Sequence, residues 1–348
     1  MTIHRVAAID CGTNSIRLLI ADINSKTEDA IERTGGFRVR SAPLTDVARE
    51  MRIVRLGEGV DRTGRLSEAA LDRTMTALRE YADLIEAAAP SPRSGGPRLP
   101  FPLEAIRMVA TSATRDAANS QEFTDRVIEV LGVAPEVISG DAEARLSFTG
   151  ATRELFGSAL GDGPCQPPYL VTDIGGGSTE FVLGGPEAVG AGGQIFGRSV
   201  DIGCVRLTER HLHTDPPRPA EIAAATADID EALEEVAASV PVAKASTLVG
   251  LAGSVTTVAA IALGLHGYDP ARIHHSRGSA DRVHEIALEL LAMTRAQRAA
   301  IPAMHPGRVD VIGAGALILD RIMNRFGFAE VLVSEHDILD GIAWSLVP

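Results

Sequence analysis

Aromatic side chains are scarce in this 348-residue sequence, which has one tryptophan and three tyrosines. Proteins that bind single-stranded nucleic acid stack bases on such side chains, so their scarcity argues against that class. Positive charge is also in deficit, because the formal net charge is -13. A negative field opposes general binding to nucleic acids and to anionic membranes. We therefore expect no nucleic-acid and no membrane partner.

Cysteine is equally scarce, and Cys11, Cys165 and Cys204 are far apart in the chain. They form no CxxC pair, so we expect buried free thiols and no disulfide framework. No apolar run approaches the roughly 20 residues of a membrane-spanning helix. Asp10 also interrupts the apolar start of the chain, where a signal peptide would need a continuous apolar run. These absences predict a cytoplasmic protein in a reducing compartment.

The patterns that are present favour an α/β chain of two domains. Helical periodicity begins at about Ser67, a plausible cap, and again at about Ser120, with Gly132 as the stop of that second helix. Short apolar runs predict strands, some of which end in loops of small or polar residues. The strands expected after the first hairpin include 52–56, 105–110, 246–251 and 331–335, and the expected loops include 90–100, 111–117 and 161–168.

Two glycine-rich turns share one pattern. In V-A-A-I-D-C-G-T-N-S (6–15) and V-T-D-I-G-G-G-S-T-E (171–180), Asp, Gly and Ser occupy the same offsets after an apolar strand. Each turn opens one half of the chain, so the pattern predicts a duplicated α/β unit. The three consecutive glycines at 175–177 indicate that something comes very close to the backbone.

Such turns can direct several backbone N–H groups at one anion, and two of them facing one another would hold a phosphate chain. The candidate phosphate-binding residues in them are Gly12, Thr13, Asn14, Ser15, Arg17, Gly175, Gly176, Gly177, Ser178 and Thr179. A carboxylate repels phosphate, so Asp10 and Asp173 are predicted to hold a divalent cation, directly or through water. Plain hairpin turns with capping or solvated aspartates are the alternative.

Two polar segments carry further candidates. In T-S-A-T-R-D-A-A-N (111–119), Arg115 could bind phosphate as a bidentate fork and Asp116 could accept a proton from water. In S-G-D-A-E-A-R (139–145), Asp141 and Glu143 lie beside a helix start, where helix capping is the alternative role.

A third glycine-containing segment, G-L-A-G-S-V-T-T (250–257), precedes a predicted helix. Its Gly253 and Ser254 could bind an anion at the helix N-terminus, although close packing of strand on helix explains this segment better when it is taken alone. Among nine histidines, His274, His275 and His336 attract interest. No spacing such as HExxH appears, so surface or core histidines are favoured.

Taken together, the sequence resembles the exopolyphosphatase/guanosine pentaphosphatase family, within the actin, sugar-kinase and heat-shock ATPase superfamily. The matching blocks follow one another along almost the whole chain, which makes the resemblance specific. They are residues 8–20, 55–66, 109–119, 137–148, 173–180, 201–209, 249–257 and 333–343.

The resemblance implies two ribonuclease-H-like α/β domains with the active site in the cleft between them. Domain I would span 1–132, with the last helix, about 336–348, packing back on it, and domain II would span 133–335. The implied reaction is hydrolysis of the terminal phosphoanhydride of inorganic polyphosphate with Mg²⁺ or Mn²⁺, by a homodimer. The implied metal residues are Asp10, Asp173 and Glu143, and the implied catalytic residues are Glu143, Asp116 and Asp141.

Several points stay open at the level of sequence. Ser112 occupies a position where some relatives are expected to carry Glu, so the general base is either Asp116 or the Asp141/Glu143 pair. Longer family members carry a helical extension resembling an HD-type phosphohydrolase, and a short form is expected to prefer short polyphosphate. The alternatives are a pppGpp 5′-phosphohydrolase, a non-catalytic sensor of (p)ppGpp or polyphosphate, and a kinase of the same superfamily; (p)ppGpp is thus a candidate substrate or inhibitor.

Overall fold

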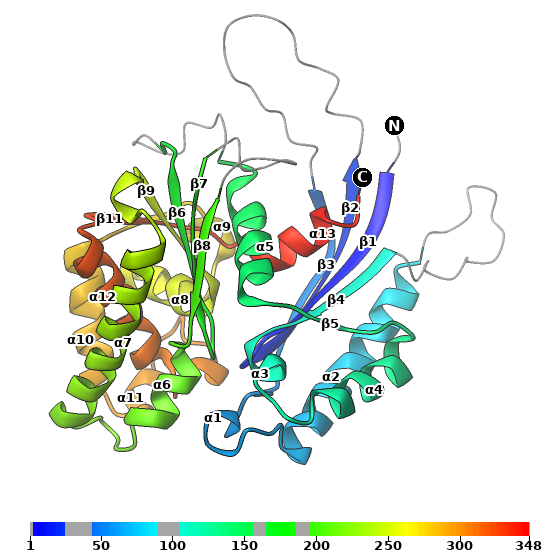
Figure 1. Cartoon of the computed structure of the whole chain (residues 1–348), viewed down its shortest axis with the longest axis horizontal. Helices are drawn as coiled ribbons and strands as arrows, with labels where there is room; N and C mark the ends of the chain where they lie inside the picture. Colours follow the sequence, from blue (N-terminus) through cyan, green and yellow to red (C-terminus); the bar gives the residue numbers. More distant parts are fainter. Residues whose placement is uncertain (1–2, 25–43, 90–104, 156–164, 186–194, 348) are drawn as a thin grey trace, which may run out of the picture. The chain divides into compact units, whose positions relative to one another are not determined.

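The computed structural model describes residues 3–24, 44–89, 105–155, 165–185 and 195–347. The chain forms two compact units, coloured along the sequence in Figure 1: unit 1 comprises Met1–Ser139 and Ile338–Pro348, and unit 2 comprises Gly140–Asp337. The boundaries expected from the sequence, at 132/133 and 335/336, lie a few residues before these positions. The loop predicted at 90–100 and the first part of the loop predicted at 161–168 lie outside the described residues.

Unit 1 is built on a five-stranded sheet in the order β3-β2-β1-β4-β5. The first three strands are antiparallel neighbours, whereas β4 and β5 run parallel to β1. The strands are β1 (Ile3–Cys11), β2 (Ser15–Asn24), β3 (Leu44–Ile53), β4 (Ile106–Ala110) and β5 (Glu136–Val137). Side chains on both faces of β1 and β2 are buried, which explains why these strands are almost continuously apolar in sequence.

The helices of unit 1 follow the predicted apolar periodicity. In α2 (Glu68–Ala87) the buried Leu71, Met75 and Leu78 share one face, and the Ser67 hydroxyl caps the helix by accepting from Ala70 N. The helix α4 (Ser120–Leu131) packs beside α2 and ends at Gly132 with a φ of 73°. Both predicted helices are confirmed. The last helix, α13 (Ile338–Trp344), contacts β1, β2 and β4 of the same unit, and α1 (Val60–Thr63) is a single turn.

Unit 2 repeats this plan with one added edge strand. Its sheet has the order β10-β11-β9-β6-β7-β8, in which β8, β7 and β6 are antiparallel and β9 and β11 are parallel to β6. Read from β8, the order and directions match β3-β2-β1-β4-β5, which confirms the predicted duplication. The strands are β6 (Tyr169–Ile174), β7 (Thr179–Gly184), β8 (Phe196–Val200), β9 (Thr247–Leu251), β10 (Arg277–Ser279) and β11 (Glu330–Val333).

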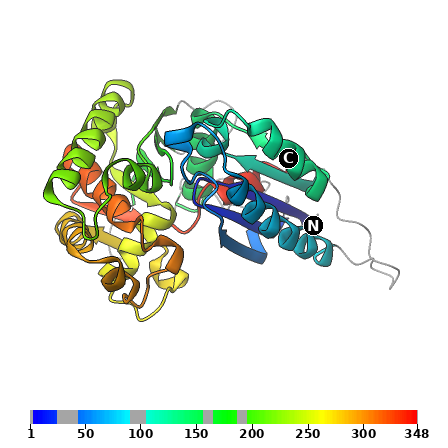
Figure 2. The same cartoon turned by 90° about the horizontal axis from the view of Figure 1, so that it is seen from below.

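The sheet of unit 2 has apolar cores on both faces. On one face, Ala144 and Phe148 of α5 (Gly140–Thr152) pack against Val171 and Val182. The other face carries a larger core with helices of the second half of the chain, seen in green to orange in Figures 1 and 2. Those helices are α6 (Cys204–His211), α7 (Pro219–Ser239), α8 (Ala252–Ala262), α9 (Pro270–Ile273), α10 (Ala280–Ala292), α11 (Arg295–Ala299) and α12 (Ile312–Phe326), with 3₁₀ turns at Val242–Lys244 and Pro306–Arg308.

Three local predictions are corrected by the structure. The segment 111–117 is not wholly a loop, because Ser112–Arg115 form one helical turn, α3. No loop separates β9 from its helix: α8 begins at Ala252, whose φ of 66° makes the bend. The strand expected at 52–56 is the end of β3, which starts at Leu44 and stops at Ile53.

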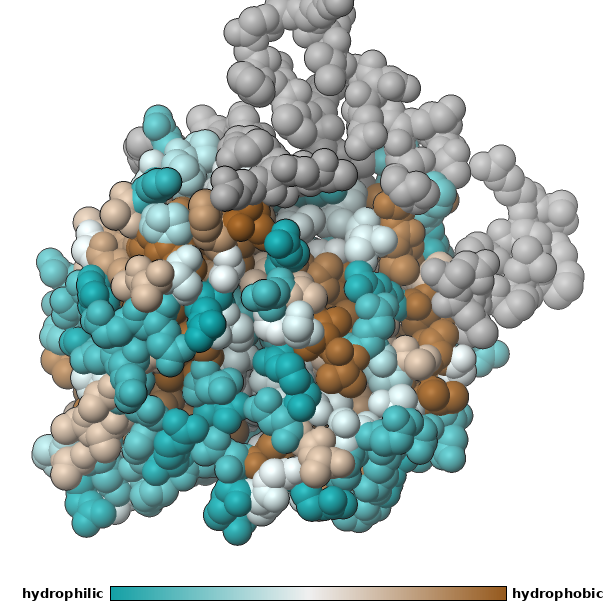
Figure 3. Space-filling view, in the orientation of Figure 1, coloured by the Kyte–Doolittle hydropathy of each residue, from teal (hydrophilic) through white to brown (hydrophobic). Residues whose placement is uncertain are grey.

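The face of the molecule drawn in Figure 3 is mainly hydrophilic, with smaller hydrophobic areas among the polar side chains. Large exposed apolar side chains are dispersed along the chain, and they are Ile3, Val47, Ile128, Val137, Tyr268 and Leu288. Among the helices that the structure describes, none combines the length and apolarity needed to cross a bilayer.

Candidate functional site

The glycine turn of unit 2 is fixed by the segment that follows β8. The turn itself is closed by a hydrogen bond from Gly175 N–H to Ser178 O, at 3.0 Å. Its carbonyl groups accept hydrogen bonds from the start of α6. These are Cys204 N–H to Gly175 O at 3.0 Å, Val205 N–H to Gly176 O at 2.9 Å, and Arg206 Nε to Gly177 O at 2.7 Å. The first N–H groups of α6, which lack partners within their helix, are thereby satisfied.

Gly203 lies so close to this turn that position 203 itself has no room for a side chain. A Cβ atom on Gly203 would lie 2.4 Å from the carbonyl carbon of Gly176 and 2.6 Å from that of Gly177. The backbone before α6 therefore touches the backbone of the turn. The close approach predicted from the consecutive glycines is made here by the protein itself, and the sequence-based interpretation as a phosphate contact is not required to explain it.

The glycine turn of unit 1 is held in the same way. Gly12 N–H donates to Ser15 O at 3.0 Å, and the segment after β3 donates to the turn carbonyls. Gly57 N–H bonds Thr13 O at 2.9 Å, and the N–H groups of Val54 and Arg55 bond Asn14 O at 3.1 and 2.9 Å. The duplication therefore includes the turn and also the backbone segment whose N–H groups bond the turn carbonyls, which we call the clamp. The side-chain Oδ1 of Asn14 is buried without a hydrogen-bond partner.

In unit 2, α5 brings a hydroxyl and a carboxylate toward the end of β6. Asp173 is 7 % exposed and accepts a 2.7 Å hydrogen bond from Ser147 Oγ. Glu143 lies one helical turn before Ser147, on the same face of α5, and is also buried. Asp141, the other candidate at this helix start, is exposed. The structure thus places Glu143, but not Asp141, on the buried face near Asp173.

A further buried carboxylate, Glu180, was not among the predicted site residues. It lies directly opposite Asp173 in the β6–β7 register, is 1 % exposed, and accepts a 2.8 Å hydrogen bond from Ser199 Oγ. A Cβ atom on Gly140 would lie 2.4 Å from Ser199 Cβ, so Ser199 also touches the first residue of α5. The signal was present in the sequence, because Glu180 follows Asp173 at the offset at which Arg17 follows Asp10.

Asp10 of unit 1 forms an ion pair with Arg17, the residue at the corresponding offset. Arg17 Nη2 and Nε lie 2.6 and 3.0 Å from Asp10 Oδ2, and Asp10 is 4 % exposed. Burial and the Asp10 charge raise the pKa of the neighbouring Cys11 thiol, so Cys11 is an inert, protonated core residue. Arg17, predicted as a phosphate ligand, therefore also forms an ion pair with Asp10.

The segment that carries Arg115 and Asp116 packs against the first turn. The Thr13 and Ser112 hydroxyl oxygens are 2.8 Å apart, and Thr111 N–H donates to Cys11 O at 3.2 Å. Arg115 Nη1 donates to Ile138 O at 3.0 Å, and Asp116 is exposed at the end of α3. Unit 1 thus brings Asp10, the 12–15 turn and residues 111–116 together.

The third glycine segment is occupied by packing contacts. Gly253 lies beneath the Arg308 guanidinium, whose Cζ would be 2.6 Å from a Cβ at this position. A Cβ on Gly315 of α12 would lie 2.2 Å from Ser254 Oγ, so that hydroxyl is pressed against α12. These contacts favour the packing interpretation of Gly253 and Ser254. Arg308 is far downstream, and no local sequence pattern indicates that it lies here.

The model of the Ppx/GppA phosphatase family matches residues 36–348. The chain belongs to the Ppx/GppA phosphatase family. This confirms the resemblance carried by the sequence blocks.

Other Ppx/GppA proteins resemble the chain over its full length. Exopolyphosphatase 2 of Mycobacterium tuberculosis is 47 % identical, and the alignment covers 99 % of each chain. The guanosine-5′-triphosphate,3′-diphosphate pyrophosphatase of Aeromonas salmonicida is 27 % identical over 98 % of this chain and 59 % of its own length. The crystal structure of an exopolyphosphatase-like protein superimposes with a TM-score of 0.82 at 40 % identity, covering 98 % of both chains. The two-domain α/β fold is that of the family.

The metal residues expected from the Ppx/GppA resemblance are divided between the two units. Among the described residues, the one group of three His, Cys, Asp or Glu ligand atoms within 4.8 Å of one another is Glu154, His274 and His336. Asp10 belongs to unit 1, whereas Asp173 and Glu143 belong to unit 2. All three nevertheless offer carboxylate oxygens, and Asn14 Oδ1 is an unpartnered acceptor in the turn after Asp10. This donor chemistry fits Mg²⁺, which prefers oxygen ligands.

Proposed function

We propose that this chain is an exopolyphosphatase, which hydrolyses the terminal phosphoanhydride of inorganic polyphosphate and releases orthophosphate. The observation that carries the proposal is the pairing, in unit 2, of a rigid glycine turn with Asp173, Ser147 and the buried Glu143. The full-length similarity to a mycobacterial exopolyphosphatase supports the choice of substrate. Phosphoryl transfer needs mainly positioning and charge stabilisation, and a fixed turn beside carboxylates that hold a divalent cation could supply both.

The two turns are proposed as the phosphate-binding elements. Their carbonyl groups accept hydrogen bonds from the protein, and the N–H groups of Gly12 and Gly175 donate within the turns. The candidate donors to phosphate oxygens are the other turn N–H groups and the hydroxyls of Ser15 and Ser178, and Thr13 could join them through its hydroxyl, which shares a hydrogen bond with that of Ser112. Thr179 is a weaker candidate, because its hydroxyl donates to Ile202 O at 2.5 Å. Arg115 would add positive charge to the phosphate site.

We propose Asp10, Asp173 and Glu143 as the residues that hold Mg²⁺ or Mn²⁺, directly or through water. A bound divalent ion would offset the negative charge of the phosphate oxygens. Glu143 is the favoured residue to orient or deprotonate water, because it is buried, whereas Asp116 and Asp141 are exposed. A buried carboxylate can hold a water molecule in a fixed position, whereas water at an exposed carboxylate exchanges freely with solvent.

A second candidate function is hydrolysis of the 5′-terminal phosphate of pppGpp. The similarity to the Aeromonas pyrophosphatase favours it, and the anhydride chemistry is the same. Binding of (p)ppGpp without turnover is the corresponding inhibitor or sensor role. A cytoplasmic homodimer remains a prediction of the sequence.

Phosphate release measured side by side from short polyphosphate, long polyphosphate, pppGpp and ATP, with Mg²⁺, tests the proposal. Release chiefly from polyphosphate supports it, and the ratio of short to long chains tests the expected preference for short ones. Release chiefly from pppGpp would promote the second candidate. Tight ligand binding with no release from any of the four would contradict both enzymatic proposals.

A further inference from the structure

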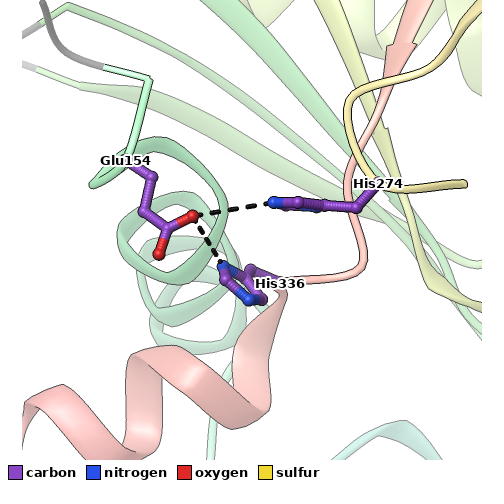
Figure 4. Close-up of side chains that lie close together, drawn as sticks. All are labelled: Glu154, His274 and His336. Atoms are coloured by element: carbon purple, nitrogen blue, oxygen red, sulfur yellow. Dashed lines mark ion pairs between the residues drawn. The ribbon is translucent and has the colours of Figure 1, made fainter. Parts of the chain in front are cut away.

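Unit 2 contains a second group of metal-ligating side chains at the other end of α5. Glu154 Oε2 lies 3.2 Å from His336 Nδ1 and 3.6 Å from His274 Nε2. Figure 4 shows both imidazoles facing this same carboxylate oxygen. At about 1.5 Å per helical residue, Glu154 is roughly 16 Å along the axis from Glu143, so the group is distinct from the proposed phosphate site.

The two histidines are held by separate and well-supported pieces of backbone. His274 follows α9, and the next residue, His275, donates its N–H to Val333 O of β11 at 2.7 Å. His336 is held in a turn by Ser334, whose Oγ accepts from His336 N–H at 3.0 Å and donates to His336 O at 2.8 Å. Donors on such supports are positioned before a ligand arrives.

The group is also open to solvent. The side chains of His274, His336 and Glu154 are 21 %, 30 % and 47 % exposed. An ion can therefore enter without unfolding, and a fourth coordination position can be filled by water. Two imidazoles and one carboxylate form the donor set typical of zinc and its first-row neighbours, whereas Mg²⁺ selects oxygen ligands.

We propose that Glu154, His274 and His336 bind a divalent transition-metal ion, with Zn²⁺ as the probe, at a site separate from the proposed Mg²⁺ residues. The alternative is a hydrogen-bonded cluster in which the two imidazoles donate to Glu154 and no metal binds.

Metal binding has a specific structural cost at His274. Its Nδ1 now accepts a 3.1 Å hydrogen bond from Glu335 N–H, so its proton is on Nε2, toward Glu154. A metal bound through Nε2 displaces that proton, and a ligating imidazole carries its remaining proton on the other nitrogen. The Glu335 N–H must then find another acceptor. The amide signal of Glu335 is therefore a direct reporter of binding through His274.

The site joins two ends of unit 2. Glu154 lies just beyond α5, the helix that begins at Gly140, the first residue of the unit, and His336 precedes Asp337, the last. A bound ion would tie the helix that carries Glu143 to the segment at which the chain leaves the unit. We expect Zn²⁺ to raise the unfolding temperature of the protein, because a ligand that binds only the folded state stabilises it.

Isothermal titration of the full chain with Zn²⁺, with Mg²⁺ present throughout, tests the site. We expect one ion per chain, with affinity reduced at least about tenfold in E154Q and in H336Q, because loss of even an outer-sphere partner has such an effect. H284A is the matched control, since His284 pairs with a single carboxylate, that of Asp320, at 3.0 Å. It should bind as the wild type does.

Substitution by Co²⁺ and NMR of ¹⁵N-Glu-labelled protein add readouts that do not depend on activity. We expect the visible absorption of four-coordinate Co²⁺, lost in E154Q, and a shift of the Glu335 amide on Zn²⁺ addition. Equal Zn²⁺ affinity in the wild type, E154Q and H336Q would overturn the proposal, as would a wild-type dissociation constant weaker than about 1 mM. Glu154 is half exposed, so E154Q should fold, and circular dichroism checks this.

Discussion

The Arg17 guanidinium lies 2.6 Å from the Asp10 carboxylate, directly opposite it in the β1–β2 register. In unit 2 the same register position, opposite Asp173, is occupied by Glu180. The two turns thus share one backbone arrangement but carry opposite charge beside it. The duplicated elements are therefore not equivalent toward a metal ion or a phosphate.

The Asp10–Arg17 pair predicts that R17Q is less stable than the wild type and that its stability responds more strongly to Mg²⁺. The variant leaves the nearly buried Asp10 carboxylate without its guanidinium, which should lower the free energy of unfolding by about 3 kcal/mol. Because Asp10 then carries more uncompensated charge, added Mg²⁺ should restore more stability to R17Q than to the wild type. Chemical unfolding with and without Mg²⁺ measures both quantities.

Arg5 and Asp22 supply the control, since they face one another across the same two strands but are each 28 % exposed. R5Q should lose less than about 1 kcal/mol and show no added response to Mg²⁺. An equal Mg²⁺ response in R17Q and R5Q would remove Asp10 from the metal proposal.

The contact of Gly203 with the glycine turn predicts that G203A is strongly impaired. The added Cβ would meet backbone atoms, which cannot rotate away, so the turn must shift. We expect a loss of about 1–3 kcal/mol in stability. Phosphate release should fall up to about a hundredfold, because displacement of positioning groups by about 1 Å has such an effect.

G267A is the control for the general effect of alanine, since a Cβ at Gly267 meets no atom within 4 Å. It should keep the wild-type melting temperature and activity. Wild-type activity in a folded G203A would show that the clamp does not position the turn for catalysis.

The burial of Glu143 and the exposure of Asp141 predict a ranking of two neighbouring variants. E143Q should reduce phosphate release by about 10²–10⁴-fold, the usual contribution of a general base. D141N should lose clearly less, because water reaches that carboxylate freely. Release rates with saturating Mg²⁺ give the ranking, and the reverse order would transfer the role of base to Asp141.

The lowered pKa of Glu221 predicts that the free energy of unfolding depends on pH. Its carboxylate accepts hydrogen bonds from the Thr214 hydroxyl and, at 2.8 Å, from Arg218 N–H, and these bonds lower its pKa from 4.5 to about 2. A carboxyl with a lowered folded-state pKa stabilises the fold above its unfolded value and loses that contribution as the pH falls through the folded value. E221Q should therefore be less stable than the wild type at pH 7, and the difference should shrink as the pH falls from about 4.5 toward 2.

Urea unfolding at pH 7, 5 and 3.5 measures that difference. E231Q, at an exposed position of the same helix, is the control and should follow the wild type at every pH. A difference between E221Q and the wild type that stays constant down to pH 3.5 would contradict the assignment.

Much of the fold follows from local pattern. The two hairpins, the caps at Ser67 and Gly132 and the repeat of Asp, Gly and Ser are all readable in sequence, because each depends on near neighbours along the chain. The sequence predicted only the C-terminal end of β3, as part of a strand at 52–56. Among the described strands it pairs with β2 only, and its side chains are partly exposed, so neither an apolar run nor a clean alternation marks it.

The candidate site was only partly predictable, because its geometry depends on distant contacts. The α3 turn is fixed by hydrogen bonds of residues 111 and 112 to the first hairpin, which lies about a hundred positions earlier. The clamp by Gly203 and the cover of Gly253 by Arg308 likewise join residues that no local pattern relates. His274 and His336 were singled out in the sequence, but their grouping with Glu154 was missed for the same reason, since the spacing matches no local metal motif.

The last helix, α13, completes unit 1 only at the end of synthesis. α13 contacts β1, β2 and β4, and its Ile338, Leu339 and Ile342 are buried, yet the ribosome makes all of unit 2 before it reaches this helix. All elements of unit 2 are therefore synthesised before the final element of unit 1 is available. A released chain that ended before Ile338 would expose to proteases and chaperones the apolar surface of unit 1 that α13 covers, although it would contain every element of unit 2.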